Sequence, residues 1–182
     1  MFVQTEVTPN PNSLKFLPGK KVSNSGPYEI TKKDRVHNEL VRNILSINGV
    51  EGVFLGEDFI SVNKNDLTKW EDVKHIIISF INDFYSEGKK FVIDENLKEQ
   101  NSNLDEIEEK IIKILDQKIR PAVARDGGDI KFKEFKDGIV KVQLQGSCSG
   151  CPSSTMTLKQ GVQKANLIAS NKIKRIKEIV GF

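Results

Sequence analysis

Residues 130–154 of this chain read IKFKEFKDGIVKVQLQGSCSGCPSS. Two segments with alternating apolar side chains, Ile130–Phe135 and Ile139–Leu144, flank the dipeptide Asp137-Gly138. Alternation is typical of strands with one buried face, and Asp-Gly is typical of tight β-hairpin turns. The stretch therefore predicts a β-hairpin, and the residues after its second strand carry the chemistry.

The loop after this hairpin, Gly146–Pro152, contains both cysteines of the 182-residue chain, Cys148 and Cys151. Proline is tolerated in the first turn of a helix and serine is a preferred cap, so Pro152 and the serines after it predict a helix start. Backbone N–H groups and the helix dipole at such a start favour thiolate over thiol. We expect an exposed Cys-x-x-Cys loop between a strand and a helix.

Two thiols separated by two residues are compatible with several kinds of site. A soft metal centre usually takes about four protein ligands, and this chain offers two cysteines. Its histidines, His37 and His75, fall on predicted helices in the other half of the sequence, where a surface role is the simpler interpretation. One hypothesis is a thiol–disulfide oxidoreductase, which the predicted helix before the hairpin disfavours. A second is half of a zinc site in an interaction module, and a third is half of an iron–sulfur site completed by another copy of the chain.

The segment Asp126–Asp129 reads Asp-Gly-Gly-Asp and directly precedes the first strand of the hairpin. We interpret it as a tight turn in which the glycines supply unusual backbone angles and the carboxylates cap the turn. Carboxylates are hard ligands and match an iron–sulfur core poorly. Because the sequence also lacks a Ser/His/Asp, Cys/His or phosphate-loop arrangement, we expect no enzymatic activity.

Composition excludes several classes of protein. The formal charge of +3 is small and argues neither for nor against nucleic acid. Aromatic residues are not interleaved with basic ones, so we expect no nucleic-acid partner. No apolar run has the length of a membrane span, so we expect no membrane contact. Met1–Val7 alternates like a strand and has the features of neither a secretory signal nor a transit peptide. We expect a reducing compartment, which disfavours a structural disulfide: the bacterial cytoplasm, or the mitochondrial matrix for a processed eukaryotic chain.

A polar segment, 94–103, is typical of a linker and divides the chain into domains at 1–93 and 104–182. We expect an α+β fold with two small domains, the second ordered α-β-β-α-β. Hydrophobic periodicity predicts these elements in the first domain: strands Phe2–Thr8, Leu14–Leu17, Tyr28–Ile30, Val50–Leu55, Phe59–Val62 and Phe91–Ile93, and helices Val36–Ile47 and Trp70–Phe84. In the second domain it predicts a helix Leu104–Ile119 that Pro121 kinks or ends, the hairpin, a helix Ser153–Ala169 and a strand Lys172–Phe182.

Two groups of motifs resemble the NifU-like (Nfu) family of iron–sulfur cluster scaffold and carrier proteins. The first resembles its carboxy-terminal NifU domain: Arg120-Pro121, Asp126–Ile130, Gly146–Ser154 and Thr157–Lys159. The second, Thr8–Phe16 with Leu17–Gly19, resembles the opening of its amino-terminal domain.

This resemblance implies that Cys148 and Cys151 are cluster ligands and that two chains share one cluster as a homodimer. It implies a [4Fe-4S] cluster in preference to a [2Fe-2S] cluster. It further implies that an upstream assembly system supplies the cluster and that apo iron–sulfur proteins accept it. The amino-terminal domain is then expected to tune partner choice or dimerisation.

Overall fold

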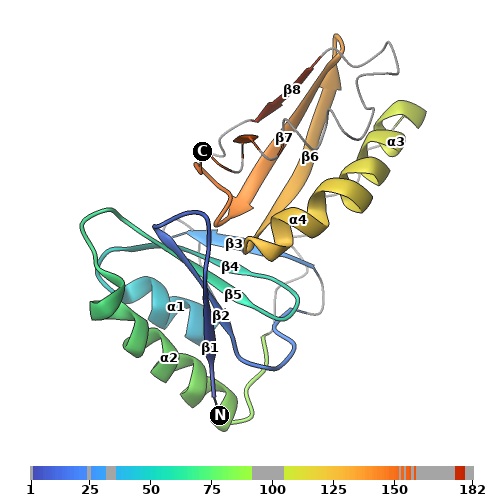
Figure 1. Ribbon diagram of the computed structural model, residues 1–182. Helices are drawn as coiled ribbons and strands as arrows, with labels where there is room; N and C mark the ends of the chain where they lie inside the picture. The colour runs from blue at the N-terminus through green and yellow to red at the C-terminus, as the bar shows by residue number, and fades with distance from the viewer. Residues whose placement is uncertain are drawn as a thin grey trace.

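The computed structural model describes residues 2–23, 26–31, 36–91, 105–151 and 175–178, together with Ser153, Thr155, Met156 and Leu158. The fold is α+β and contains two separate hydrophobic cores (Figure 1). We call residues 2–91 the amino-terminal unit and residues 105–178 the carboxy-terminal unit. Among the helices described, none combines the length and the apolar character needed to cross a bilayer.

The described part of the amino-terminal unit is a five-stranded antiparallel sheet with two helices on one face (Figure 1). The strands lie in the order β1-β2-β5-β4-β3, with bounds β1 Gln4–Val7, β2 Ser13–Leu17, β3 Tyr28–Thr31, β4 Val50–Leu55 and β5 Ile60–Lys64. The helices are α1 (Glu39–Ser46) and α2 (Trp70–Ser86). These elements agree with the predicted ones, except that Phe91 is not in a strand and residues 92–93 lie outside the described part.

Alternation along the strands creates the two faces of this sheet. On β5, Ile60 and Val62 point into the core beneath the helices, so Ser61 and Asn63 point to the opposite face. On β4, Val53, Phe54 and Leu55 are consecutive and all buried, although a strand can direct only alternate side chains into one core. We call the face away from the helices the outer face. It too must be covered, and the carboxy-terminal unit stands on it (Figure 1).

The described part of the carboxy-terminal unit packs a helical segment against a three-stranded sheet of order β6-β7-β8. The elements are α3 (Glu106–Ile114), η2 (Leu115–Ile119), α4 (Arg120–Arg125), β6 (Gly128–Lys136), β7 (Ile139–Gly146) and β8 (Arg175–Glu178). Strands β6 and β7 are antiparallel, and β8 runs parallel to β7. The core between helices and sheet includes Ile111, Leu115, Ile119, Val123, Ile130, Val140, Val142 and Leu144.

The helix passes Pro121 without ending there, contrary to one of our two expectations. The five residues of η2 form a π-helical turn, in which the N–H of Arg120 bonds to the carbonyl of Leu115 five positions earlier. Proline lacks an N–H and its ring collides with the carbonyl four positions earlier in an ordinary helix. The wider turn removes this conflict and lets α4 continue with Pro121 in its first turn.

The hairpin prediction is confirmed. Asp137 and Gly138 both have left-handed backbone angles, with φ of 54° and 79°, as the tight hairpin turn requires. Of the helix predicted to follow the cysteine loop, the described residues Ser153, Thr155, Met156 and Leu158 are helical and the others lie outside the described part. Within the last predicted strand, β8 covers Arg175–Glu178.

Candidate functional site

The cysteine loop begins where β7 ends, at Gly146. Gly146 and Gly150 have φ of 66° and 68°, a left-handed conformation that costs a residue with a Cβ about 1–2 kcal/mol. Between them the chain turns, with N–H···O bonds from Ser149 to Gly146 (3.3 Å) and from Cys151 to Cys148 (3.4 Å). The N–H of Thr155 bonds to the carbonyl of Cys151 at 3.3 Å, so helical bonding starts at the second cysteine. The loop thus lies between a strand and a helix, as predicted.

Cys148 lies inside the core of the carboxy-terminal unit and is only 1% exposed. Its S–H donates to the carbonyl oxygen of Val123 on α4, with a distance of 3.8 Å. On its other side it meets the start of β6, where a Cβ built on Gly128 would come within 2.8 Å of the sulfur. Gly128 therefore makes room for this thiol, and α4 gives it a hydrogen-bond acceptor.

Cys151 is also buried, at 5% exposure, and its sulfur lies 2.9 Å from the hydroxyl of Ser153. Our expectation of an exposed loop was therefore wrong for both sulfurs. In the structure both thiols are buried, that of Cys148 against Val123 and Gly128, whereas Gly150 is exposed.

The donor set fits a soft centre only in part. The loop holds the sulfurs of Cys148 and Cys151, and thiolate sulfur is the usual protein ligand of iron–sulfur clusters. Among the described residues, no three His, Cys, Asp or Glu side chains come together as a ligand group. His75 lies on α2, which covers the face of the amino-terminal sheet away from the loop (Figure 1). The described part of one chain therefore supplies two suitable ligands.

We had expected Asp129 to cap the turn before β6. Instead it stands at the start of β6 and bonds to Arg120. Its carboxylate accepts a 2.8 Å hydrogen bond from Nε of Arg120, and Nη2 of Arg120 donates to the carbonyl of Ile130. Burial raises the pKa of Asp129, and the positive charge of Arg120 acts against that rise. The pair fastens the helical segment to β6, so the carboxylate has a structural role beside the loop.

Side chains of the amino-terminal sheet reach the backbone around the cysteine loop. Glu29 accepts a 2.9 Å hydrogen bond from the N–H of Gly146, and Asn63 donates a 3.0 Å bond to the carbonyl of Gly146. Ser61 donates to the carbonyl of Gly127 at 2.7 Å. Asn10, in the loop after β1, donates to the carbonyl of Ser147 at 3.0 Å. The sequence alone predicted no site role for any of these four side chains.

Close packing accompanies these bonds. Phe54 is 1% exposed and belongs to neither hydrophobic core. A Cβ built on Gly146 would come within 2.9 Å of its ring and within 2.7 Å of the carbonyl oxygen of Gly127. A Cβ on Gly127 would lie 2.7 Å from the hydroxyl of Ser61. The sequence held one signal of this contact, the uninterrupted run Val53–Leu55, which indicates a strand covered on both faces.

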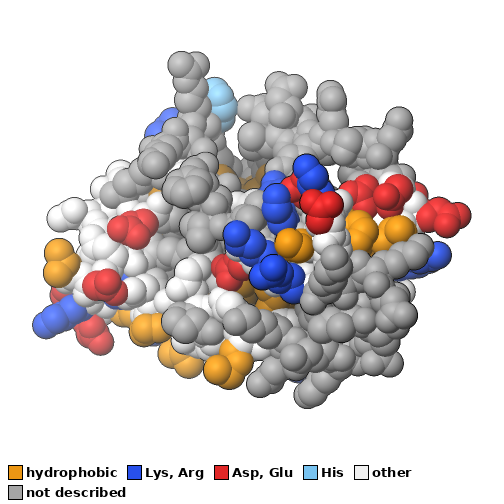
Figure 2. Space-filling view, turned by 90° about the horizontal axis from the view of Figure 1, so that it is seen from above, with side chains coloured by type: hydrophobic (Ala, Val, Ile, Leu, Met, Phe, Trp, Pro, Cys, Tyr) orange, Lys and Arg blue, Asp and Glu red, His pale blue; other side chains and the backbone are white. Residues whose placement is uncertain are grey.

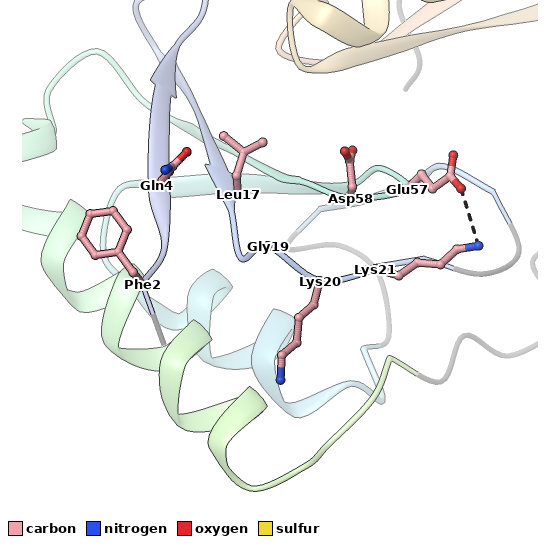
Figure 3. Close-up of a pocket in the computed structure, with 8 residues that line it drawn as sticks. All are labelled: Phe2, Gln4, Leu17, Gly19, Lys20, Lys21, Glu57 and Asp58. Atoms are coloured by element: carbon pink, nitrogen blue, oxygen red, sulfur yellow. Dashed lines mark ion pairs between the residues drawn. The ribbon is translucent and has the colours of Figure 1, made fainter.

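A groove of about 680 Å³ lies elsewhere on the amino-terminal unit, where β1 and β2 meet the loop before β5 (Figure 3). An ion pair of 3.5 Å between Lys21 and Glu57 crosses one side of it. Its lining holds neither thiol nor imidazole, so it offers no soft ligand: Phe2, Gln4, Leu17, Gly19, Lys20, Lys21, Glu57 and Asp58.

The surface seen from above shows basic and acidic side chains next to one another among the described residues (Figure 2). Ion pairs between described residues include Lys141–Glu134, at 2.5 Å. A nucleic-acid site usually gathers basic side chains into one patch.

Comparisons with known proteins agree on one family. Residues 3–88 match the domain described as "Scaffold protein Nfu/NifU N terminal", and residues 111–177 match the "NifU-like domain". The chain is 44% identical over 167 residues to the human "NFU1 iron-sulfur cluster scaffold homolog, mitochondrial", covering 90% of this chain and 66% of that protein. It is 39% identical over 186 residues to the "NifU-like protein 4, mitochondrial" of Arabidopsis thaliana, covering 98% of this chain and 66% of the relative.

A solved structure is similar as well. The solution NMR structure of a NifU-like protein from Saccharomyces cerevisiae shares 29% identity, with a TM-score of 0.48, over 52% of this chain and 87% of that one. The chain spans just under two thirds of the length of the human and plant relatives. Both family domains are matched, in the order that the motifs at Thr8–Gly19 and Gly146–Ser154 indicate, and together they take up most of the sequence. The chain therefore belongs to the NifU-like (Nfu) family, with an amino-terminal Nfu domain and a carboxy-terminal NifU domain.

Proposed function

We propose that this protein is an iron–sulfur cluster scaffold and carrier whose cargo is held by Cys148 and Cys151. The observation that carries the proposal is the ligand count: one loop presents two thiols, and the described residues add no third ligand. Clusters usually take about four protein ligands, so two chains together complete the set. The names of the human and plant relatives, one of them an iron–sulfur cluster scaffold homologue, support the same conclusion.

Half a ligand set per chain suits a carrier. A cage of four cysteines in one chain would hold its cluster too firmly to donate it. When two chains share a cluster, their separation exposes iron to the thiolates of an acceptor. In this scheme the protein transfers a cluster to apo iron–sulfur proteins and carries out no catalysis of its own. The preferred cargo is a [4Fe-4S] cluster.

Binding requires a change at the thiols. The S–H of Cys148 is bonded to Val123 inside the core, and ligation needs a deprotonated sulfur that reaches a second chain. Cys151 lies at the start of helical bonding, where backbone N–H groups favour a thiolate. The loop therefore has to turn outward before it can hold cargo.

We further propose that the carboxy-terminal domain, residues 104–182, holds the cluster, and that residues 1–93 form a separate domain across the 94–103 linker. The separate cores and the separate family matches support this division. The relatives are named as mitochondrial, which favours the mitochondrial matrix over a bacterial cytoplasm for this chain. Cell fractionation with antibody detection tests the compartment.

Anaerobic reconstitution with iron and sulfide tests the proposed function. We expect a brown protein with broad absorption near 400 nm, a range typical of thiolate-ligated clusters. Iron and sulfide contents and Mössbauer spectra then identify the cluster, and incubation with an apo iron–sulfur protein tests transfer. A colourless protein that binds zinc indicates the interaction module instead. A colourless protein that reduces disulfides catalytically indicates the oxidoreductase.

A further inference from the structure

The side chains that reach the cysteine loop come from one region of the outer face of the amino-terminal sheet. Glu29 on β3 pairs with Phe54 on β4, and Phe54 pairs with Ser61 on β5, so the three form a row across the strands. Asn63 lies two residues beyond Ser61 and therefore shares its face. Asn10 adds a contact from the loop between β1 and β2. We call these five residues the clasp.

The clasp bonds to backbone groups just before β6 and at the end of β7, where the cysteine loop begins. Its side chains donate hydrogen bonds to the carbonyl of Gly127, just before β6, and to the carbonyl of Gly146, the last residue of β7. Gly146 is held through its N–H as well as its carbonyl, and Ser147 is held through its carbonyl. Gly146 and Ser147 directly precede Cys148, so the clasp fixes the backbone that carries the first thiol.

The conformation that the clasp fixes has its sulfurs directed inward. Cys148 is 1% exposed and bonded to Val123 in the core, where the thiol of a second chain cannot share a cluster with it. Turning this sulfur outward rotates the backbone of Ser147 and Gly146, which the clasp holds by hydrogen bonds. Docking on the clasp and ligation of cargo therefore require two different conformations of the same few residues.

We propose that the clasp is an internal docking surface for the empty cysteine loop, and that cluster loading releases the loop from it. Glu29 supplies a physical reason for release. Its carboxylate occupies the N–H of Gly146, and loop N–H groups are the donors that bond to the sulfurs of a cluster. A cluster with thiolate ligands is anionic, so it also repels a carboxylate in this place. The release rests on the proposed function, whereas the docking does not.

Thiol reactivity of the full chain without cargo tests the docking. The reduced protein is treated with iodoacetamide, and modification of Cys148 is followed by mass spectrometry. Ser61→Ala and Asn63→Ala each remove one donor to the loop. Each is expected to raise the alkylation rate about fivefold, the factor that one ordinary hydrogen bond contributes, and the double variant about 20-fold. An unchanged rate in a double variant that circular dichroism shows to be folded overturns the docking.

Matched variants separate the clasp from general destabilisation. Ser79 is an exposed serine on α2, on the opposite side of the sheet, and Ser79→Ala is expected to leave the rate unchanged. Glu29→Ala is expected to raise the rate about fivefold, because it removes the acceptor for Gly146. Glu29→Gln keeps an acceptor oxygen and is expected to stay near the wild-type rate. An accelerated Ser79→Ala variant contradicts the assignment to the clasp.

Radical footprinting of the wild-type protein tests the release and needs no substitution. Phe54 is 1% exposed because the carboxy-terminal unit covers it, whereas Phe16 is 0% exposed within the amino-terminal core. Cluster loading is expected to raise oxidation of Phe54 severalfold and to leave Phe16 unchanged. Unchanged oxidation of Phe54 in protein with a full complement of iron and sulfide overturns the release.

The two proposals fail in different ways. If the protein takes up no iron and sulfide, the cluster function is wrong, while the alkylation rates still decide whether the clasp holds the empty loop. If the protein takes up a cluster but Ser61→Ala and Asn63→Ala leave Cys148 equally unreactive, the function stands and the clasp is wrong.

Discussion

Arg120 and Asp129 form an ion pair in which Nε of the arginine lies 2.8 Å from Oδ1 of the aspartate. The aspartate side chain is 4% exposed and the arginine side chain 41%, so the pair is buried on one side and partly solvated on the other. It joins the start of α4 to the start of β6. Gly128, directly before Asp129, is the residue that makes room for the sulfur of Cys148.

Arg120→Met is expected to lower the free energy of unfolding at neutral pH by about 2 kcal/mol, because a buried carboxylate loses its cation. Burial raises the pKa of Asp129 above its value in the unfolded chain. Between these two pKa values the folded protein holds a proton that the unfolded chain releases. The free energy of unfolding therefore falls as the pH rises through this range. Without Arg120 the pKa rises further. Urea unfolding is therefore expected to show that Arg120→Met loses less unfolding free energy near pH 5 than at neutral pH. Lys113→Met, at an exposed lysine on α3, is the charge-matched control. An equal loss at both pH values contradicts the role of the carboxylate.

Replacement of either cysteine by serine is expected to abolish cluster retention, because a hydroxyl is a harder and far less acidic ligand. The two variants should differ in stability. Cys148 lies in the core, so Cys148→Ser is expected to lower the free energy of unfolding by about 1 kcal/mol, and Cys151→Ser by less. Iron and sulfide analysis and urea unfolding measure the two effects. A full cluster in either single variant would remove that residue from the ligand set.

Cluster-loaded protein is expected to be a homodimer with one cluster per two chains, related by a two-fold axis near the cluster. Protein without a cluster is expected to be largely monomeric. Light scattering after size exclusion gives the number of chains per particle. Iron and sulfide measured on the same fractions give the number of clusters per chain. A loaded monomer with one full cluster per chain contradicts the shared site.

The segment 104–182 is expected to bind a cluster without residues 1–93, since it contains both thiols and its own core. Reconstitution of the isolated segment and of the full chain, compared by absorption and iron content, checks this. A segment that folds and yet fails to bind would assign part of the binding to the amino-terminal domain.

Gly146 and Gly150 make a matched pair for substitution. Both have left-handed φ, but only Gly146 is crowded, whereas a Cβ on Gly150 meets nothing within 4 Å. Gly150→Ala is expected to cost about 1 kcal/mol of unfolding free energy, from backbone strain alone. Gly146→Ala is expected to cost about 3 kcal/mol or more, because its Cβ also collides with Gly127 and Phe54. Equal losses in urea unfolding would contradict the close approach of the two units.

Local signals predicted the elements of this fold well. The Asp137-Gly138 turn and the alternating strands were confirmed because each depends on residues close in sequence. Pro121 was harder, since its usual effect is to end a helix and the π-helical turn before it has no sequence signal of comparable strength. Cys148 and Cys151 were assigned as cluster ligands from the cysteine spacing and the family resemblance, and this assignment stays a prediction.

Contacts between the units could not be predicted in the same way. Ser61 alternates with Ile60 and Val62, which is typical of a strand with a solvent-exposed polar face. Its hydroxyl is in fact fully buried against the carbonyl of Gly127, 66 positions away in sequence. Alternation shows which side chains share a face, but what covers that face depends on a partner that the local pattern does not encode.

The parallel pairing of β8 with β7 has a mechanical consequence. β8 pairs with the first half of β7, from Ile139 to Val142, and the N–H of Arg175 bonds to the carbonyl of Gly138. The cysteines follow the other end of β7, after Gly146. Among the described residues, β7 is therefore flanked by two strands at its first half and by β6 alone at the end that leads into the cysteines. An outward turn of the cysteine loop would leave the pairing of β8 with β7 unchanged.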